Sequence, residues 1–230
     1  MKQDVLLRIR GLAAGYLDIP VLTGIDLELE RGEFLGVFGH NGMGKTTLLR
    51  TIMGQLRAQQ GELIFDDRPL HNLSVAQRAR LGLGYVPQGR QIYSDLTVRE
   101  NLKVAVLAVR AAESRIDETL TLLPRLEPIL DRQGGVLSGG EQQILALGRC
   151  LVSQPRLILL DEPTEGIQPS IREEIIEVLH QLRASRGLSM ILVEQNLSFL
   201  EALSDRIVVL QKGVIRSDLP ATELASLLTG

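Results

Sequence analysis

The chain has no tryptophan, and its few phenylalanines and tyrosines bring the aromatic content to only 3%. Proteins that bind single-stranded nucleic acid stack bases on aromatic side chains, so this scarcity argues against that class. A net charge of −3 likewise gives the whole chain no electrostatic attraction to DNA or RNA. We therefore expect no nucleic-acid partner.

Cysteine is almost absent too, because Cys150 is the only one and cannot form an internal disulfide. That usage is typical of proteins in a reducing compartment. No stretch approaches the roughly 20 apolar residues that span a bilayer, and the opening MKQDVLLRIR lacks the apolar segment of a signal peptide. We expect a cytoplasmic chain, and work at a membrane would require other chains to supply the spanning part.

What the chain does contain is enough apolar sequence, 44% of 230 residues, for one large domain or two small ones. Alternating or apolar segments predict strands at residues 5–9, 21–30, 34–38, 62–65, 84–86, 157–160 and 189–193, with a closing hairpin at 207–210 and 213–216. Helical patterns cover residues 44–53, 98–109, 114–123, 141–151, 170–183, 197–203 and 222–228. The order predicts a single α/β domain, 1–230, with a helical insertion at about residues 88–155 in a nucleotide-binding core.

The first motif is a glycine-rich loop between a predicted strand and a predicted helix. It fits the pattern G-x-x-x-x-G-K-[ST] and comprises Gly39, His40, Asn41, Gly42, Met43, Gly44, Lys45 and Thr46, with Thr47 following. Such a loop points backbone N–H groups at phosphates, and the helix adds its positive N-terminus. Lys45 is expected to reach the β- and γ-phosphates, and the Thr46 hydroxyl to ligate Mg²⁺. The alternative is an ordinary glycine-rich turn, but chance gives this pattern in roughly one chain of this length in a hundred.

The second motif is a pair of acids, Asp161 and Glu162, that ends the apolar strand at 157–160. Ligands of open α/β sheets bind at the carboxyl edge of the strands. Asp161 is expected to hold Mg²⁺ through water, and Glu162 to act as the general base toward an attacking water. Alone, the pair could be a solvated turn, since Pro163 follows, but its company with the phosphate loop favours the functional interpretation.

The third motif is the string Leu137 to Gln142, LSGGEQ, which lies between the other two. Ser138 precedes a helical pattern and could cap it, and the two glycines permit close backbone approach. A bare S-G-G would be read as a helix cap. The full string beside a phosphate loop and an acidic strand resembles the signature motif of ATP-binding-cassette (ABC) ATPases, and that resemblance covers nearly the whole chain.

The resemblance implies a P-loop NTPase (RecA-like) core with an antiparallel β subdomain and a helical signature subdomain. It implies ATP and Mg²⁺ as ligands and a head-to-tail dimer, in which Ser138, Gly139 and Gly140 bind the γ-phosphate of ATP held by the other subunit. Tyr16 resembles the aromatic residue that stacks on adenine, although an ordinary half-buried tyrosine is an equal alternative. Gln88 resembles the Q-loop glutamine, which senses Mg²⁺ or water, and residues 90–101 follow it where transporters contact their permeases.

Two positions depart from the usual family pattern. Gln195 stands where the family usually has a switch histidine beside the γ-phosphate, and Gln168 stands where the D-loop usually has aspartate. Glutamine donates a hydrogen bond but does not titrate near neutral pH. V-E-Q-N at the switch is nevertheless familiar in ATPases of importers for branched-chain amino acids and small amides. Within that branch, P-T-E-G-I-Q-P-S (163–170) and V-P-Q-G-R (86–90) resemble the urea-importer ATPase.

The expected function is therefore ATP hydrolysis that energises an importer, for urea or short amides, with Glu162, Gln195 and Gln88 at the catalytic centre. Expected partners are a second ATPase subunit in a heterodimer or homodimer, two permeases, and indirectly a solute-binding protein, at the cytoplasmic face of the plasma membrane. Alternatives are a branched-chain amino-acid importer ATPase and an ATP-gated clamp with little hydrolysis. A soluble ABC protein that acts on DNA or ribosomes is less favoured, because such proteins usually have tandem cassettes or basic extensions. A kinase would leave the LSGGEQ string unexplained. A GTPase would carry the guanine-specificity motif N-K-x-D, which is absent.

Overall fold

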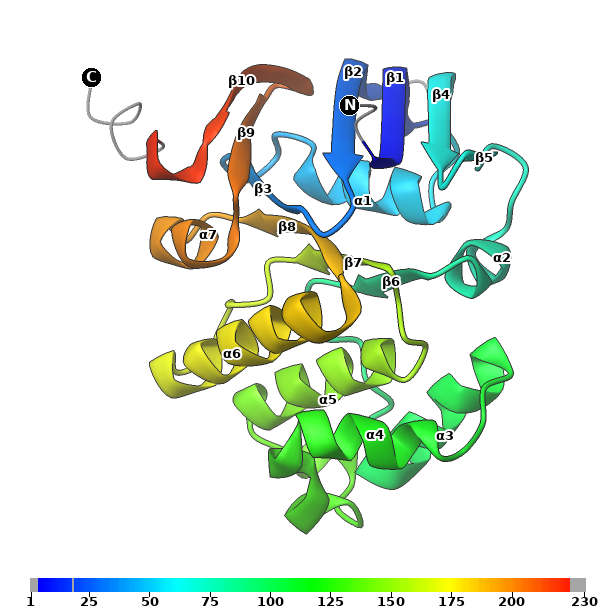
Figure 1. Ribbon diagram of the computed structural model, residues 1–230, viewed down its shortest axis with the longest axis vertical. Helices are drawn as coiled ribbons and strands as arrows, with labels where there is room; N and C mark the ends of the chain where they lie inside the picture. The colour runs from blue at the N-terminus through cyan, green and yellow to red at the C-terminus, as the bar shows by residue number, and fades with distance from the viewer. Residues whose placement is uncertain (1–3, 18, 224–230) are drawn as a thin grey trace.

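The computed structural model describes residues 4–17 and 19–223. The amino-terminal part forms an antiparallel sheet in the strand order β2-β1-β4-β5, drawn at the top of Figure 1. Its strands are β1 (Val5–Tyr16), β2 (Ile19–Glu30), β4 (Gln60–Phe65) and β5 (Arg68–Pro69). Buried and more exposed residues alternate over residues 25–30 of β2, because one face of the sheet is buried and the other meets water.

The second sheet has the strand order β10-β9-β3-β8-β7-β6 and runs in Figure 1 from β10 at the upper left down to β6 near the centre. Its members are β3 (Phe34–Phe38), β6 (Leu83–Val86), β7 (Leu157–Asp161), β8 (Ser189–Glu194), β9 (Arg206–Gln211) and β10 (Val214–Pro220). All neighbouring pairs from β9 to β6 are parallel, and β10 pairs antiparallel with β9 as a hairpin. The carboxyl ends of β3, β8, β7 and β6 therefore share one edge of the sheet.

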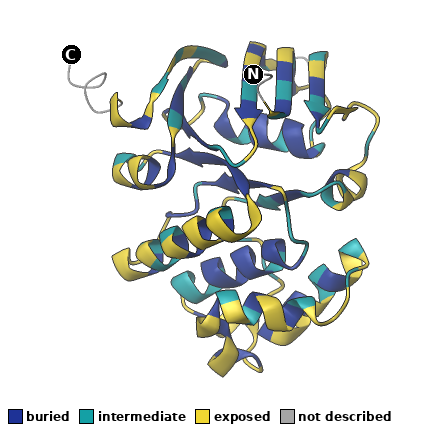
Figure 2. Ribbon diagram, in the orientation of Figure 1, coloured by how far each residue is buried: buried dark blue, intermediate teal, exposed yellow. Residues whose placement is uncertain are grey.

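The six-stranded sheet is buried on both faces, which explains why its strands read as continuous apolar runs. In β8, Met190 and Leu192 belong to the core on the helical side, while Ile191 and Val193 belong to the core beneath the antiparallel sheet. Side chains alternate in direction along a strand, so each strand serves two cores. Figure 2 accordingly draws these central strands in the dark blue of buried residues.

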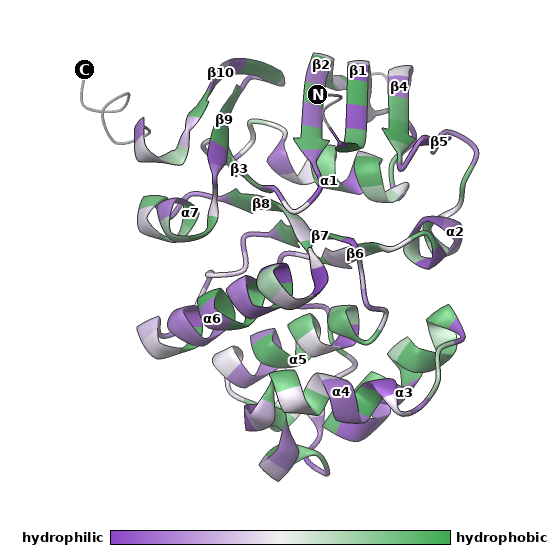
Figure 3. Ribbon diagram, viewed as in Figure 1, coloured by the Kyte–Doolittle hydropathy of each residue, from purple (hydrophilic) through white to green (hydrophobic). Residues whose placement is uncertain are grey.

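The described residues also form seven α-helices: α1 (Lys45–Met53), α2 (Val75–Arg80), α3 (Val98–Val109), α4 (Arg115–Leu122), α5 (Gly139–Leu151), α6 (Pro169–Arg186) and α7 (Leu197–Leu203). Short 3-10 turns lie at Pro124–Ile129, Gly134–Val136 and Ala221–Glu223. Helix α1 packs in the core between the two sheets. Helix α6 buries an apolar stripe and turns hydrophilic residues outward, purple in Figure 3. Among the described residues no helix combines the length and apolarity needed to cross a membrane.

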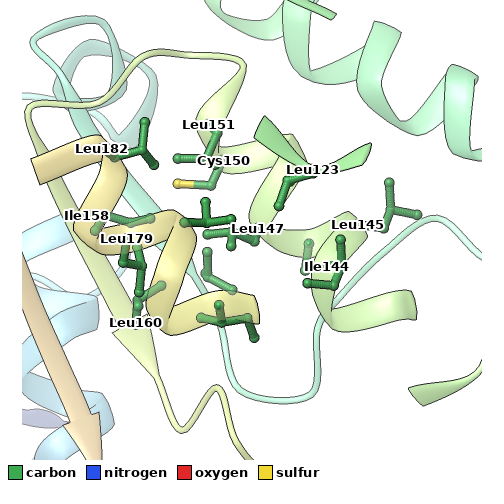
Figure 4. Close-up of a cluster of buried hydrophobic side chains, with 14 of the residues drawn as sticks. Leu123, Ile144, Leu145, Leu147, Cys150, Leu151, Ile158, Leu160, Leu179 and Leu182 are labelled. Carbon is green, nitrogen blue, oxygen red and sulfur yellow. The ribbon is translucent and has the colours of Figure 1, made fainter. Parts of the chain in front are cut away.

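Helix α5, which begins with the signature glycines, is anchored at both its start and its apolar face. Figure 4 shows Leu147 and Leu151 of α5 in one cluster with side chains of α6 and β7. At its N-terminus, the Ser138 hydroxyl accepts from the Glu141 N–H and the Glu141 carboxylate accepts from the Ser138 N–H. This capping box satisfies two helix-end donors. The backbone hydrogen bond from Ser138 is the main reason that the pKa of Glu141 lies below its usual value.

The predicted α/β class with a P-loop NTPase core, an antiparallel sheet and a helical part is confirmed. Strand β1 runs to Tyr16, whereas the predicted strand ended at residue 9. The prediction stopped early because bulges shift the register of β1 and break its period-two pattern. Helix α2 was not predicted from the sequence. The predicted helix at 222–228 is a 3-10 turn as far as Glu223, and its remainder lies outside the described residues. The segment 88–155 holds α3, α4 and α5, and its treatment as an inserted subdomain stays a prediction.

Candidate active site

Four loops leave the shared carboxyl edge of β3, β6, β7 and β8, and they carry most of the residues that the motifs singled out. β3 leads into the loop that starts α1, β6 leads to Gln88, β7 ends at Asp161, and β8 is followed by Gln195. The strand order β3-β8-β7-β6 sets these loops next to one another. Segments far apart in sequence thus converge where α/β sheets bind ligands.

The phosphate loop turns into α1 at Gly44, whose φ of 103° lies in the left-handed region that favours glycine. Lys45, only 4% exposed, curls back so that its Nζ donates to the His40 carbonyl at 3.2 Å. The side chains of His40 and Met43 engage other groups: the His40 ring meets Phe38, and Met43 Sδ accepts from the Lys212 N–H.

Glu162 contacts the side chains of Lys45, Gln195 and Gln88. Its Oε1 lies 3.1 Å from Lys45 Nζ, with the two side chains only 4% and 10% exposed. It also accepts from Gln195 Nε2 at 3.1 Å, while its Oε2 accepts from Gln88 Nε2 at 3.0 Å. The φ of Glu162 is +47°, a conformation that a non-glycine residue adopts only under local constraint. A carboxylate held this way can accept a proton from water that enters beside Lys45.

Asp161 is nearly fully buried and accepts hydrogen bonds from two hydroxyl groups. Thr46 Oγ1 donates to its Oδ1 and Tyr85 OH donates to its Oδ2, each at 3.0 Å. Burial raises the pKa of the Asp161 carboxyl, and these two hydrogen bonds act in the opposite direction. Burial also raises the pKa of Tyr85, so that hydroxyl keeps its proton. A carboxylate and a threonine hydroxyl, with the Gln88 amide nearby, are the oxygen donors that Mg²⁺ prefers, so the residues present fit this ion.

Gln195, the residue in place of the usual histidine, is in contact with the same centre. Its Nε2 donates to Asn41 Oδ1 at 2.8 Å as well as to Glu162. Behind it, the buried Glu194 carboxylate accepts from the Gln195 N–H at 2.8 Å and from Thr164 Oγ1 at 2.7 Å. Gln168 lies at the N-cap position of α6, and its side chain makes no cap hydrogen bond there.

These residues surround a cleft of about 320 Å³, lined by Val21, Asn41, Gly42, Gly44, Lys45, Thr46, Thr47, Gln88 and Glu162. The predicted site residues outside this lining are Tyr16, Gly39, His40, Met43, Ser138, Gly139, Gly140, Asp161 and Gln195. Tyr16 is 42% exposed at the end of β1, with its hydroxyl 3.5 Å from Arg50 Nη1 on α1. Ser138 is exposed at the start of α5. A larger hollow of about 710 Å³ includes Glu33 and Asp205, which precede β3 and β9 at the opposite edge of the sheet. Most of its charged groups pair with one another.

Sequence reasoning did not assign a function to Tyr85 or Glu194, which contact the predicted site residues. Tyr85 lies one residue before the end of β6, paired in register with Leu159 of β7. The parallel pairing of these strands brings its hydroxyl to Asp161. The sequence showed only that Tyr85 lies just before the Q-loop. Its hydrogen-bond partner Asp161 could not be predicted, because that contact depends on the register between β6 and β7.

Comparison with known proteins agrees with this geometry. The family model described as ABC transporter matches residues 22–165, more than half of the chain. The branched-chain amino acid transport ATP-binding protein BraG of Pseudomonas aeruginosa is 39% identical over 87% of this chain and 86% of its own length. The probable counterpart LivF of Archaeoglobus fulgidus is 35% identical over 95% and 94%.

Solved structures of ATP-binding subunits of ABC transporters have the same fold as this chain. A nucleotide-free ATP-binding cassette from an ABC transporter superposes with a TM-score of 0.89 at 24% identity, covering 98% of this chain and 96% of that one. An ATP-binding subunit of an ABC transporter reaches 0.86 at 26% identity over 97% and 93%. Together with the phosphate loop, the paired acids and the signature helix, these matches show that the chain belongs to the ABC transporter family and is one of its ATP-hydrolysing subunits.

Proposed function

We propose that this chain energises an importer of branched-chain amino acids from the cytoplasmic face of the plasma membrane. The observation that carries the proposal is the likeness to BraG and LivF over nearly the whole chain. The string V-E-Q-N at 193–196 fits the same branch. The segments at 86–90 and 163–170 resemble a urea-importer ATPase, but the relatives' names favour the amino-acid alternative.

In the proposed reaction, ATP enters the cleft with its phosphates over the N-terminus of α1. Lys45 exchanges its contact with Glu162 for the β- and γ-phosphates, and Tyr16 stacks on adenine. Glu162 accepts the proton of the attacking water as the new P–O bond forms and the bond to ADP breaks. Gln195 and Gln88, which both donate to Glu162, orient the carboxylate and the water. Thr46, Asp161 and Gln88 are the residues that would hold Mg²⁺, and the ion would supply positive charge beside the phosphate oxygens.

The signature residues suit a second subunit better than their own cleft. Ser138 is exposed and its glycine neighbours do not line the cleft of the same chain. We propose a head-to-tail dimer in which Ser138, Gly139 and Gly140 contact the γ-phosphate bound by the partner, and in which the partner is a different ATPase. N–H groups at a helix start are suited to an anion.

The proposed permease contact is a groove of about 340 Å³ beside the Q-loop. It is lined mainly by apolar and small side chains of α2, α3, α5 and β6, including Val75, Ala79, Ala105, Val109 and Ala146. Pro87 and Arg90 also line it, so a chain seated there would touch the loop that carries Gln88. We propose that two permeases dock on two such grooves and that a solute-binding protein acts through them.

Uptake measurements in cells test the proposal, because the ATPase itself contacts no solute. Deletion of the gene should abolish uptake of labelled leucine, isoleucine and valine, and the wild-type gene, but not Glu162→Gln, should restore it. Loss of labelled urea uptake alone would support the urea importer instead. Unchanged uptake of all these solutes would refute both. ATP turnover near zero by the isolated transporter, with solute present, would support the clamp alternative.

A further inference from the structure

Arg90 connects three segments that the motifs treat separately. Its Nη1 donates to Gln142 Oε1 of α5 at 3.1 Å, and its Nη2 donates to the Glu165 carbonyl at 3.3 Å. Glu165 belongs to the loop between β7 and α6. The backbone is left-handed at Arg90 and again at Gln91, with φ of +67° and +47°. Two such non-glycine residues in succession are held only where the surroundings demand it.

The glycines around the guanidinium leave room for it. A Cβ on Gly139, the first signature glycine, would lie 2.9 Å from Arg90 Nη2 and 3.2 Å from the Gly166 carbonyl. A Cβ on Gly166 would lie 3.3 Å from the same nitrogen. A side chain at Gly139 would therefore push the guanidinium out of its place between the two loops. Glycine at 139 therefore leaves the space that the Arg90 guanidinium occupies, apart from any contact with phosphate.

The neighbouring residues extend the same connection in both directions. Gln88 Nε2 donates to Glu165 Oε2 at 3.2 Å in addition to Glu162. Gln142 Nε2 donates to the Gly134 carbonyl at 3.1 Å, which ties the start of α5 to the turn before it. The loop at 88–90 is thereby bonded to the helix that presents Ser138 and to the loop that follows Glu162.

We propose that Arg90 is a positioning residue for ATP hydrolysis, holding the start of α5 against the 165–166 loop. This inference rests on the proposed head-to-tail dimer, in which Ser138 serves one nucleotide and Glu162 the other. Arg90 fixes the spacing between those two groups of one chain, so that both sites of the dimer close together. A planar guanidinium directs two NH₂ groups to separate acceptors, whereas a lysine ammonium offers one point charge, so lysine does not replace it.

The test compares Arg90→Met, Arg90→Lys and Gln142→Leu, with Arg186→Met on α6 as the matched control. Each variant is measured for ATP affinity as the isolated chain, for ATP-driven dimerisation in a Glu162→Gln background, and for steady-state hydrolysis. We expect unchanged ATP affinity, weaker dimerisation, and kcat lowered about tenfold for both Arg90 variants, the size of one lost hydrogen bond to a charged group. The double variant Arg90→Met/Gln142→Leu should lose no more than Arg90→Met alone.

The possible outcomes separate the two proposals. Wild-type kcat in Arg90→Met overturns the role of Arg90 and leaves the proposed function standing. Reduced ATP affinity of the isolated variant also overturns it, because the guanidinium would then act on the nucleotide of its own chain. Full rescue by lysine, or strict additivity with Gln142→Leu, contradicts the two-acceptor geometry. Failure of the Glu162→Gln chain to form an ATP-dependent dimer, either with itself or with the partner ATPase subunit, refutes the head-to-tail dimer and with it this inference.

Discussion

Lys45 and Glu162 face each other across the phosphate cleft, with 3.1 Å between Nζ and Oε1. Lys45 begins α1 and Glu162 follows β7, so the pair joins the two motifs that bracket the site. Both side chains are largely buried, and neither group meets much water. The pair holds the ammonium and the carboxylate in place, and in the proposed reaction phosphate oxygens replace the carboxylate as the partner of Lys45.

Glu162→Gln should separate binding from cleavage. The amide cannot accept the proton of water, so kcat should fall by about 10²- to 10⁴-fold, the usual contribution of a general base. It also carries no charge to hold Lys45, so ATP affinity should be equal or higher. Single-turnover hydrolysis and calorimetric titration with ATP measure the two effects. Hydrolysis at the wild-type rate would rule out Glu162 as the base.

Gln195 should act as a hydrogen-bond donor whose effect does not change with pH. Gln195→Leu removes the contacts to Asn41 and Glu162 and should lower kcat about tenfold. Gln195→His keeps a donor but titrates, so its rate should gain an inflection at about pH 6.5 that wild type lacks. Rate profiles of the three proteins from acid to neutral pH test this. Wild-type turnover by the leucine variant would contradict the role.

Ser138 and Thr97 cap their helices in the same way, which allows a matched comparison. Each side chain accepts from the N–H three residues on, as part of a capping box. Alanine at either position should cost about 1 kcal/mol of unfolding free energy. Only Ser138→Ala should also lower ATP-driven dimerisation and turnover, because only Ser138 is proposed to meet a second nucleotide. Equal losses of activity in both variants would mean that Ser138 acts only as a helix cap and does not contact a second nucleotide.

Arg78 should be a stability residue without a catalytic effect. Its buried guanidinium donates to the carbonyls of residues 51, 52, 70 and 73, which include the last turn of α1. Arg78→Met leaves these acceptors without their donor and should lower the unfolding free energy by about 3 kcal/mol. Denaturant titration measures it, with exposed Arg80→Met on the same helix as the control. The ATP affinity of the folded fraction should not change.

Cys150 should resist thiol reagents in the folded protein. Burial raises the pKa of its thiol from the ordinary 9.0 to about 12, so almost no thiolate forms near neutral pH. It is the only cysteine, so labelling reports this site alone. Labelling with a chromogenic disulfide at about pH 8 should be slow until denaturant is added. The neutral thiol favours folding below pH 9.0, and that contribution is lost as the pH rises toward 12.

The sequence was sufficient for those parts of the site where a motif has a fixed geometry. The phosphate loop and the acids at 161–162 lie at the predicted ends of predicted strands, and the parallel order brings them together. Arg78 was beyond reach, because α2 has only six residues and the partners of Arg78 are backbone carbonyls. Tyr85 and Arg90 were likewise hidden, since their acceptors lie on segments 52 or more residues away.

The order of strands in the six-stranded sheet also bears on how the protein is made. β3, which leads into the phosphate loop, pairs with β8 and β9, at residues 189–194 and 206–211. During synthesis, the ribosome must therefore pass residue 189 before β3 has either of its sheet neighbours. A nascent chain without β8 lacks Gln195 and leaves an apolar strand unpaired, which exposes it to aggregation. The sheet that supports the phosphate loop is therefore complete around β3 only after residues 189–211 have been made.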